Sequence, residues 1–587
     1  MSEKIRITVV AENEKLNNGL DDLREQSVFL THDTSMTLMS TLLVNDMING
    51  SFCGGRGDCG RCRIQFLQGA TLPTGLERSV LEPEELRQGY RLACLAKPKS
   101  DCVIKLCPID APEIAIISDM IGMTERIDYT SQNRECTQNQ KSNVMKSIID
   151  TVQPTDVSEY SDDSVTDVTD NNVTDVIIAV DLGTTTIAMQ LMKMETGQII
   201  DTYCEMNPQR SYGADVLSRI QASCEGNRDK LQTLVMEVLE RGVERFLHHQ
   251  VHVRCMCIAG NTTMEHLLMG YDVSSLGHSP FTPVECGLQE FVHPVWDFKV
   301  WIVPCISAFV GGDIVAGLYA CGLLTCDSEK EPSRHTAKKQ NSDEHEMAAL
   351  LIDLGTNGEM AITDGERMIV TATAAGPAFE GGAGAGIVGS DMVACTAELL
   401  RQGIMDETGL LAEPYFTKGV SVQIADEGHY QFISGRSGQG ICLTQADIRS
   451  LQMAKAAVRA GVEILLGQMG EWWKGKPQSN EQQQNKLKLY EHKVERVCLA
   501  GGFGYYLDVE AAFAIGLLPE HMRGRVQAVG NTSLVGAYRI GRDLWHGKTD
   551  GKSLERSISS IDSINLAKQP DFEELYIRYM NFSSTLF

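Results

Sequence analysis

Four cysteines near the N-terminus have the spacing expected of a metal centre. Cys53, Cys59 and Cys62 lie in one glycine-rich loop with the pattern C-x5-C-x2-C, and Cys94 follows after 31 further residues. A [2Fe–2S] cluster is held by four cysteine thiolates. The glycines between the cysteines allow positive φ values and let backbone N–H groups approach the sulfide. The pattern therefore predicts a [2Fe–2S] cluster bound by these four side chains.

The alternatives to a cluster are a structural zinc site and inert core cysteines. Zinc usually uses two C-x2-C pairs, and within the loop only Cys59 and Cys62 form one. Cys102 and Cys107 could replace Cys94, but they lie beyond the point where the pattern closes. The loop is one residue longer than the plant-type C-x4-C-x2-C spacing and resembles that of adrenodoxin-like ferredoxins.

Two copies of a D-L-G-T motif point to phosphate chemistry. Asp181 and Asp353 each follow an apolar run and precede a glycine-containing turn and a second apolar run. Each copy predicts a buried strand, a tight turn and a second strand, with N–H groups and hydroxyls arranged around an anion. An aspartate in this position can hold Mg²⁺ through water or orient an attacking water. We therefore predict Asp181 and Asp353 as catalytic residues. The predicted phosphate-binding residues are Gly183, Thr184, Thr185, Thr186, Gly355, Thr356 and Asn357.

A third glycine-containing element joins the two D-L-G-T motifs in the predicted nucleotide site. The apolar run 494–500 ends at Gly501 and Gly502, where a backbone without side chains can approach an adenine or a ribose closely. These two glycines are the predicted adenosine-binding residues. The competing interpretation is an α/β domain whose glycine turns are purely structural.

Other runs near these motifs carry further candidates. Asp215 and Asp313 are candidates for positioning a metal or a water, although an isolated aspartate more often caps a helix. Asn261 and Thr263, in the run A-G-N-T-T-M, could contact phosphate or simply shape a turn.

The elements around the cysteine loop predict a small N-terminal domain. Residues 4–11 and 63–67 read as strands, 35–47 as a helix and 103–106 as a closing strand. Strands packed on one helix, with a cluster in a long loop, are typical of the β-grasp fold of ferredoxins. We assign residues 1–110 to this domain.

The remaining boundaries follow from composition. Residues 156–175 contain seven acidic residues and no lysine or arginine, so we predict that 111–175 is an acidic, flexible linker. It either lets the cluster domain swing or is a passive spacer. Residues 176–545 form the predicted nucleotide-binding domain and 546–587 a C-terminal extension. The whole chain is thus expected to be an α/β multidomain protein.

Composition restricts the partners. The chain has 587 residues and a net charge of −26, which argues against nucleic acid or an anionic membrane as a partner, since both need basic patches. No signal peptide or spanning apolar run is evident. Of the 18 cysteines, those in apolar segments are interpreted as buried thiols in a reducing cytoplasm, for example Cys255, Cys257, Cys305, Cys321 and Cys498.

Together, the two D-L-G-T hairpins and the Gly-Gly strand resemble the superfamily of actin, heat-shock chaperones and sugar kinases (ASKHA). This resemblance implies a duplicated, two-lobed, ribonuclease-H-like ATPase with ATP and Mg²⁺ between the lobes.

The whole chain, including the cluster loop and the S-A-F-V-G-G-D and G-P-A-F-E-G runs, resembles the reductive activators of corrinoid proteins. The resemblance implies ATP-dependent, one-electron reduction of Co(II) to Co(I) in a corrinoid protein of a methyltransferase system. It also implies an external low-potential reductant, and it is compatible with a homodimer. Two alternatives stay open: an ATP-driven electron donor to another enzyme, as in 2-hydroxyacyl-CoA dehydratase activators, and a redox-sensing, nucleotide-dependent chaperone.

Overall fold

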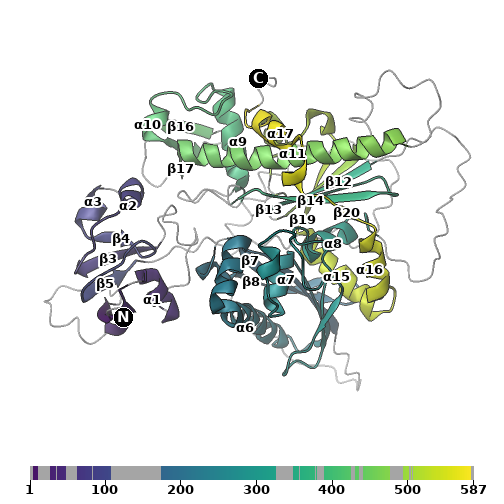
Figure 1. Cartoon of the computed structure of the whole chain (residues 1–587), viewed down its shortest axis with the longest axis horizontal. Coiled ribbons are helices and arrows are strands. Elements are labelled where there is room, and N and C mark those ends of the chain that lie inside the picture. Colours follow the sequence, from purple (N-terminus) through teal and green to yellow (C-terminus); the bar gives the residue numbers. More distant parts are fainter. Residues whose placement is uncertain are drawn as a thin grey trace, which may run out of the picture.

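The computed structural model shows an N-terminal domain and two lobes, each built on its own sheet (Figure 1). Residues 111–173 of the predicted linker, 111–175, lie outside the described residues. The structure describes residues 4–10, 27–34, 36–45, 47, 62–81, 83–107, 174–213, 215–324, 348–355, 357–376, 379, 389–424, 430–434, 441–475, 494–501, 504 and 507–582.

The N-terminal domain is a five-stranded sheet in the order β2-β1-β5-β3-β4, drawn in purple in Figure 1. β1 pairs in parallel with β5, and the other neighbours are antiparallel. Alternate strand residues such as Ile7, Ile64 and Ile104 are buried with Leu38 and Leu42 of α1. This β-grasp arrangement confirms the predicted fold. The elements are β1 (Lys4–Val10), β2 (Ser27–Asp33), α1 (Leu38–Val44), β3 (Arg63–Gln68), α2 (Gly75–Val80), α3 (Pro83–Arg87), β4 (Tyr90–Leu92) and β5 (Cys102–Leu106).

The first lobe contains a six-stranded sheet in the order β10-β11-β9-β6-β7-β8. β6, β7 and β8 form an antiparallel meander, while β9 runs parallel to β6 and β11 parallel to β9. Helices α6 and α7 cover one face. The elements are β6 (Asp175–Leu182), β7 (Thr186–Lys193), β8 (Ile199–Met206), α5 (Val216–Ala222), α6 (Arg228–Leu247), β9 (His252–Gly260), α7 (Thr262–Leu268), β10 (Gln289–Phe291), β11 (Lys299–Ile302) and α8 (Gly312–Ala320).

The second lobe repeats this topology. Its sheet has the order β19-β18-β12-β13-β14-β20, again with an antiparallel meander, β12-β13-β14, followed by two parallel neighbours, β18 and β19. The same strand pattern in both lobes confirms the predicted duplication. The elements are β12 (Ala348–Leu354), β13 (Asn357–Thr363), β14 (Met368–Ala374), α9 (Gly389–Arg401), α10 (Tyr415–Lys418), β15 (Val420–Ile424), β16 (Tyr430–Ser434), β17 (Ile441–Leu443), α11 (Gln445–Gly475), β18 (Val494–Ala500), α14 (Val509–Ala514), β19 (Val526–Gly530), α15 (Thr532–Trp545), α16 (Gly551–Ser559), β20 (Asp562–Ser563) and α17 (Phe572–Arg578).

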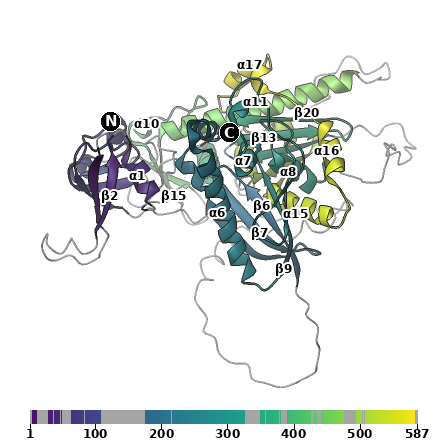
Figure 2. The same ribbon diagram turned by 60° about the horizontal axis from the view of Figure 1, so that its bottom comes forward.

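Two helices lie between the sheets and cross from one lobe to the other. α8, which follows the last strand of the first lobe, contacts β12 and β13 of the second. α15, which follows β19 of the second lobe, packs on β6 and β9 of the first. The two helices also pack on each other between the sheets (Figure 1, Figure 2). Side chains from both sheets join them in one core. The lobes are therefore built from exchanged helices.

The long helix α11 covers the other face of the second sheet together with α9 and α14. α17 packs on α11, and β20 pairs in parallel with β14. A small sheet, β16-β15-β17, lies beside this layer. Within the described part of the chain, no helix combines the length and the apolar character needed to cross a membrane.

Candidate cluster and nucleotide sites

Two of the four predicted cluster ligands lie within the described residues, and the fold brings them together. Cys62 directly precedes β3, and Cys94 follows β4, which pairs with β3. Both side chains are buried, and their Sγ atoms are 3.3 Å apart. That distance is much longer than a disulfide bond of about 2.05 Å. It is close to the roughly 3.8 Å between two thiolates on one tetrahedral metal with bonds of about 2.3 Å. The pair therefore fits ligation of a shared iron.

Cys53 and Cys59 lie outside the described residues, so their part in the site stays a prediction. Of the two substitutes considered for Cys94, Cys102 lies on β5 in the core. Burial raises the pKa of its thiol to about 12, as expected of an inert core cysteine.

The Cys94 segment is fixed by hydrogen bonds from three sides. The backbone N–H of Ala93 donates to the Cys62 carbonyl (2.8 Å), and Met39 at the start of α1 donates to the Ala93 carbonyl (2.9 Å). The buried Glu77 carboxylate accepts from the backbone N–H of Leu92 (2.9 Å). These bonds fix the backbone directly before Cys94.

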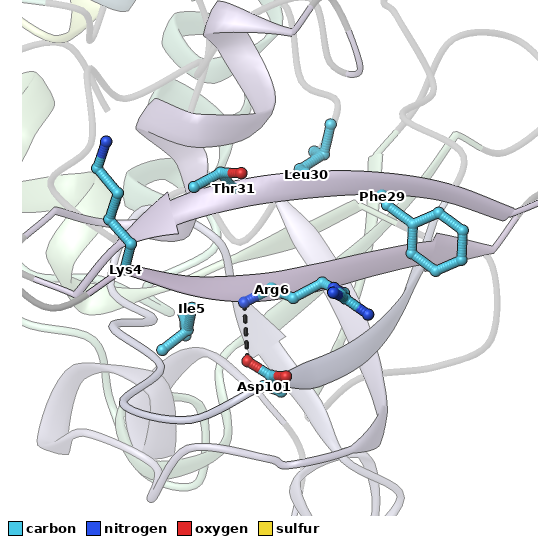
Figure 3. Close-up of a pocket in the computed structure, with 7 residues that line it drawn as sticks. All are labelled: Lys4, Ile5, Arg6, Phe29, Leu30, Thr31 and Asp101. Carbon is cyan, nitrogen blue, oxygen red and sulfur yellow. Dashed lines mark hydrogen bonds between the residues drawn. The ribbon is translucent and has the colours of Figure 1, made fainter.

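The N-terminal domain also has a hollow of about 330 Å³ on its sheet (Figure 3). It lies along β1 and β2, at the opposite edge of the sheet from the strands that carry Cys62 and Cys94. In Figure 3, Asp101 accepts a hydrogen bond from the backbone N–H of Arg6 (2.8 Å). The hollow, which lies at the other edge of the sheet, is therefore separate from the cluster site.

The first D-L-G-T hairpin has the predicted form. Asp181 lies near the end of β6, and Thr186 opens β7. Gly183 is required sterically, because a Cβ there would lie 2.5 Å from the Thr186 carbonyl oxygen. The Thr184 hydroxyl accepts a hydrogen bond from the Asn261 amide (2.9 Å). The turn is thus tied to the start of α7.

Buried polar groups support this hairpin from behind. The fully buried Arg219 donates to the carbonyls of Thr184 (2.5 Å) and Gly213 (3.0 Å). Asn207 donates to the carbonyl of Gly183 (2.9 Å), and its backbone N–H donates to Thr185 (2.8 Å). The turn's carbonyls are occupied on this side, which fixes the hairpin in one conformation.

The second hairpin matches the first. Asp353 lies near the end of β12, and the Gly355 N–H donates to the carbonyl of Asn357, which opens β13 (2.9 Å). Thr356 lies outside the described residues. Gly501, at the end of β18, has a φ of +89°, and a Cβ there would lie 2.7 Å from Asp353 Oδ1. Gly501 therefore lies directly against Asp353, the catalytic candidate of this hairpin.

The equivalent position in the first lobe is also a glycine. A Cβ on Gly260, at the end of β9, would lie 2.8 Å from the Leu182 carbonyl oxygen, just as one on Gly501 would lie 2.5 Å from that of Leu354. Gly502, the second glycine predicted to bind adenosine, lies outside the described residues.

Carboxylates from both lobes gather near the hairpin ends. Burial raises the pKa of Asp353 to about 8, and the Asp313 and Asp181 carboxylates add to the effect. Burial also raises the pKa of Asp313 to about 7, with a further contribution from Asp181. Glu359 on β13 has a pKa well above its usual range, because of burial and because of Asp313 and Asp353. The aspartates of the two lobes are thus close enough to shift one another's pKa, and we call this group the carboxylate site.

This site is suited to a cation bound together with phosphate. Within the described ranges, no three His, Cys, Asp or Glu side chains come close enough to hold a metal ion by themselves. Mg²⁺ usually keeps several waters and binds through one or two carboxylates plus substrate phosphates. The arrangement of Asp181, Asp313 and Asp353 fits that mode.

The sequence reasoning missed Asn531. Its side-chain amide donates to Asp181 Oδ2 (2.7 Å), and its Oδ1 accepts from the Leu534 N–H (2.9 Å), which caps α15. A signal was present, because G-N-T-S at 530–533 repeats the G-N-T-T of 260–263. Asn261 caps α7 in the same way, accepting from the Met264 N–H (3.1 Å).

The structure separates the two candidate aspartates. Asp313 lies in the first turn of α8 and belongs to the carboxylate site. Asp215 caps α5, accepting from the Ser218 N–H (2.8 Å) at an exposed position, so it has the structural role. Thr263 is buried in α7, whereas Asn261 contacts the hairpin through Thr184.

Three family models match the chain. They are a 2Fe-2S iron-sulfur cluster binding domain over residues 22–99, the RACo middle region over 176–325, and the C-terminal domain of RACo, the ASKHA domain, over 347–384, 383–474 and 482–587.

Individual relatives agree with the family models. The chain is 26% identical over 469 residues to the corrinoid activation enzyme RamQ of Eubacterium limosum, covering 70% of each chain. It is 23% identical over 457 residues to the [Co(II) methylated amine-specific corrinoid protein] reductase of Methanosarcina barkeri, covering 69% of this chain and 76% of that one. The solved structure of a reductive activator for corrinoid, iron-sulfur protein has the same fold, with a TM-score of 0.55, 23% identity and 98% coverage of both chains.

Proposed function

Because the chain belongs to the RACo family of corrinoid activators, we propose that it reduces a corrinoid protein from Co(II) to Co(I) at the expense of ATP. The electron comes from the [2Fe–2S] cluster bound by Cys53, Cys59, Cys62 and Cys94. The two relatives named as a corrinoid activation enzyme and a Co(II) corrinoid protein reductase support the substrate.

One observation carries the proposal most directly. A single chain combines a domain whose buried cysteine pair fits a shared iron with two lobes whose D-L-G-T hairpins end near one another. A one-electron donor and a nucleotide site are the two parts that ATP-driven reduction needs. The alternatives considered from the sequence share these parts, so the acceptor must be tested directly.

Energetics explain why ATP is needed. Reduction of Co(II) to Co(I) is uphill for an ordinary iron–sulfur donor, and each step of about 59 mV costs a factor of about ten for one electron. ATP can help only by binding unequally to two conformations of the complex. Closure of two lobes around a ligand is a motion of this kind. The exchanged helices α8 and α15 are the elements that would transmit it.

The chain's own residues then have distinct roles. The hairpin backbones at Gly183–Thr186 and Gly355–Asn357 bind the phosphates, and Gly501 and Gly502 leave room for the adenosine. Asp181 and Asp353 hold Mg²⁺ through water and orient the attacking water. When bound by the four cysteines, the cluster supplies one electron at a time. An external low-potential reductant reloads it.

Two finer points belong to this proposal. We place the protein in the reducing cytoplasm, in keeping with its buried thiols, among them Cys255, Cys257 and Cys498. A homodimer is compatible with the family resemblance, and sedimentation would establish the oligomeric state.

The test is an anaerobic spectroscopic assay. Protein reduced with Ti(III) is mixed with a Co(II) corrinoid methyltransferase subunit, with and without Mg-ATP, and the visible spectrum is followed. We expect the Co(I) band only when ATP is present, and no band with the Cys94→Ser variant. Robust ATP hydrolysis and a reducible cluster without Co(I) would reject the corrinoid as acceptor, and a pull-down would then seek another enzyme.

A further inference from the structure

Asn531 connects the two lobes through a hydrogen bond to Asp181, a predicted catalytic residue. The residue follows β19, a strand of the second lobe, yet its amide nitrogen donates to Asp181 Oδ2 of the first lobe (2.7 Å). The orientation of the amide is fixed, because its oxygen accepts from the backbone N–H of Leu534 (2.9 Å). The nitrogen must therefore face the carboxylate. An amide held at both ends is a rigid donor.

The helix that carries this donor is itself held tightly. A Cβ on Gly536 would lie 2.0 Å from the Ala316 carbonyl oxygen, so α15 and α8 cross in close backbone contact. A Cβ on Gly541 would lie 2.8 Å from the Cβ of Cys257 on β9. The Tyr538 hydroxyl donates to the Met194 carbonyl of the first lobe (2.9 Å). The position of α15 on the first sheet thus sets the position of Asn531.

Asp181 depends on this donor for a defined orientation. The Asp181 carboxylate raises the pKa of its neighbours Asp313 on α8 and Asp353 on β12. Burial raises the pKa of Asp181 itself, and the side chains of Asn531 and Ser533 oppose that effect. A buried carboxylate keeps one orientation when a fixed donor holds it.

We propose that Asn531 is a positioning residue that acts through Asp181 across the lobe boundary. It orients the carboxylate for its part in ATP hydrolysis, so that hydrolysis requires α15 to be seated between the lobes. This inference rests on the proposed function only in taking ATP as the ligand, and it makes the lobe arrangement a condition of turnover.

The first test separates the donor from the helix cap. Asn531→Ser keeps a good capping residue but cannot reach Asp181 with an amide. We expect kcat for ATP hydrolysis to fall by about tenfold or more, because the Asp181 carboxylate loses its fixed orientation. KM for ATP should change by less than about threefold, because the groups that bind ATP are unchanged. The matched control is Asp508→Ser, at the cap of α14 in the second lobe, for which kcat should stay unchanged.

The second test asks whether Asn531 acts through Asp181. The double variant Asp181→Asn/Asn531→Ser should hydrolyse ATP no more slowly than Asp181→Asn alone, because the positioned group is already lost. Losses that multiply would show an independent role and overturn the inference. A lower melting temperature for Asn531→Ser, with wild-type kcat in the folded fraction, would also overturn it, since that result describes a purely structural cap.

The outcomes also separate this inference from the proposed function. If the wild type hydrolyses ATP but does not reduce the Co(II) corrinoid, the proposed function fails, and the kcat data still decide the role of Asn531. If the wild type hydrolyses no ATP, both fail. The visible spectrum of the cluster should be the same in all variants, and the melting temperature serves as the check on the folding of the lobes.

Discussion

At the scale of single residues, the structure gives chemically similar side chains different roles. Asp353 and Asp215 are both candidate functional aspartates in the sequence, yet one belongs to the carboxylate site and the other caps an exposed helix. The difference comes from burial and from neighbours that are distant in sequence. For this reason the sequence alone left Asp215 and Asp313 as equal candidates.

The role of Asp353 can be tested against that of Asp215. We expect Asp353→Asn to lower ATP hydrolysis by about 100-fold or more, because a neutral amide holds hydrated Mg²⁺ and orients the attacking water less well than a carboxylate does. The visible spectrum of the cluster should be retained. Asp215→Asn, which keeps a good helix cap, is the control and should hydrolyse ATP at the wild-type rate. Equal rates for Asp353→Asn and the wild type would remove Asp353 from the mechanism.

Lys455 makes the stability of the second lobe depend on pH. Its ammonium group is buried in α11, donates to the Asn581 carbonyl (2.6 Å) and lies over the Phe582 ring at 4.9 Å. Burial lowers its pKa from 10.5 to about 7. Between these values the unfolded chain binds more protons, so the contribution of Lys455 to stability rises as the pH increases from 7 to 10.5.

Lys455→Met should remove this dependence. The slope of the unfolding free energy against pH should fall by up to about 1.4 kcal/mol per pH unit between pH 7 and 10. Urea denaturation at several pH values measures it. An unchanged slope would mean that Lys455 keeps its ordinary pKa in the folded protein.

At the scale of elements, the crossing of α8 and α15 decides how the lobes fit together. The strands and hairpins could be predicted from apolar runs and glycine turns, because those signals are local. The crossing could not, because it depends on which sheet a helix meets after the chain has folded. Asn531 was missed for the same reason, since its partner Asp181 lies on the other lobe.

The crossing gives a prediction for Gly536. Gly536→Ala would place a methyl group 2.0 Å from the Ala316 carbonyl oxygen, so the helices must separate. We expect a loss of about 3 kcal/mol or more in stability, together with slower ATP hydrolysis. Gly467→Ala is the matched control, because a Cβ there meets nothing within 4 Å in α11. It should stabilise the protein by about 0.5–1 kcal/mol. Thermal unfolding of both variants measures these changes. A wild-type melting temperature for Gly536→Ala would contradict the prediction.

At the scale of the whole molecule, the chain contains one self-contained domain and one pair of interdependent lobes. The N-terminal sheet closes on its own core, with Ile7, Leu42 and Ile104 among its members. The lobes instead share a core that includes residues of both sheets. The predicted boundaries at 110, 175 and 545 stay predictions.

This difference predicts how the parts behave when separated. Residues 1–110 alone should bind the cluster with the visible spectrum of the full chain, because that domain has a core of its own. Cys94→Ser in this fragment should lose the spectrum, and Cys102→Ser should keep it, since Cys102 lies in the core rather than beside Cys62. Loss of the cluster in the unmodified fragment would show that the domain needs the lobes.

The exchanged helices also affect how the protein is made. The inner face of the first sheet, including Ile177 and Cys257, is covered by Leu534, Ala537 and other residues of α15, which are synthesised long after that sheet. At about 5–20 residues per second, a ribosome needs roughly 15–60 s to extend the chain from β9 to α15. During that time the apolar face is exposed on the nascent chain. We therefore expect the first lobe to complete its folding only after α15 leaves the ribosome, and production of the protein to depend on chaperones that shield the sheet until then.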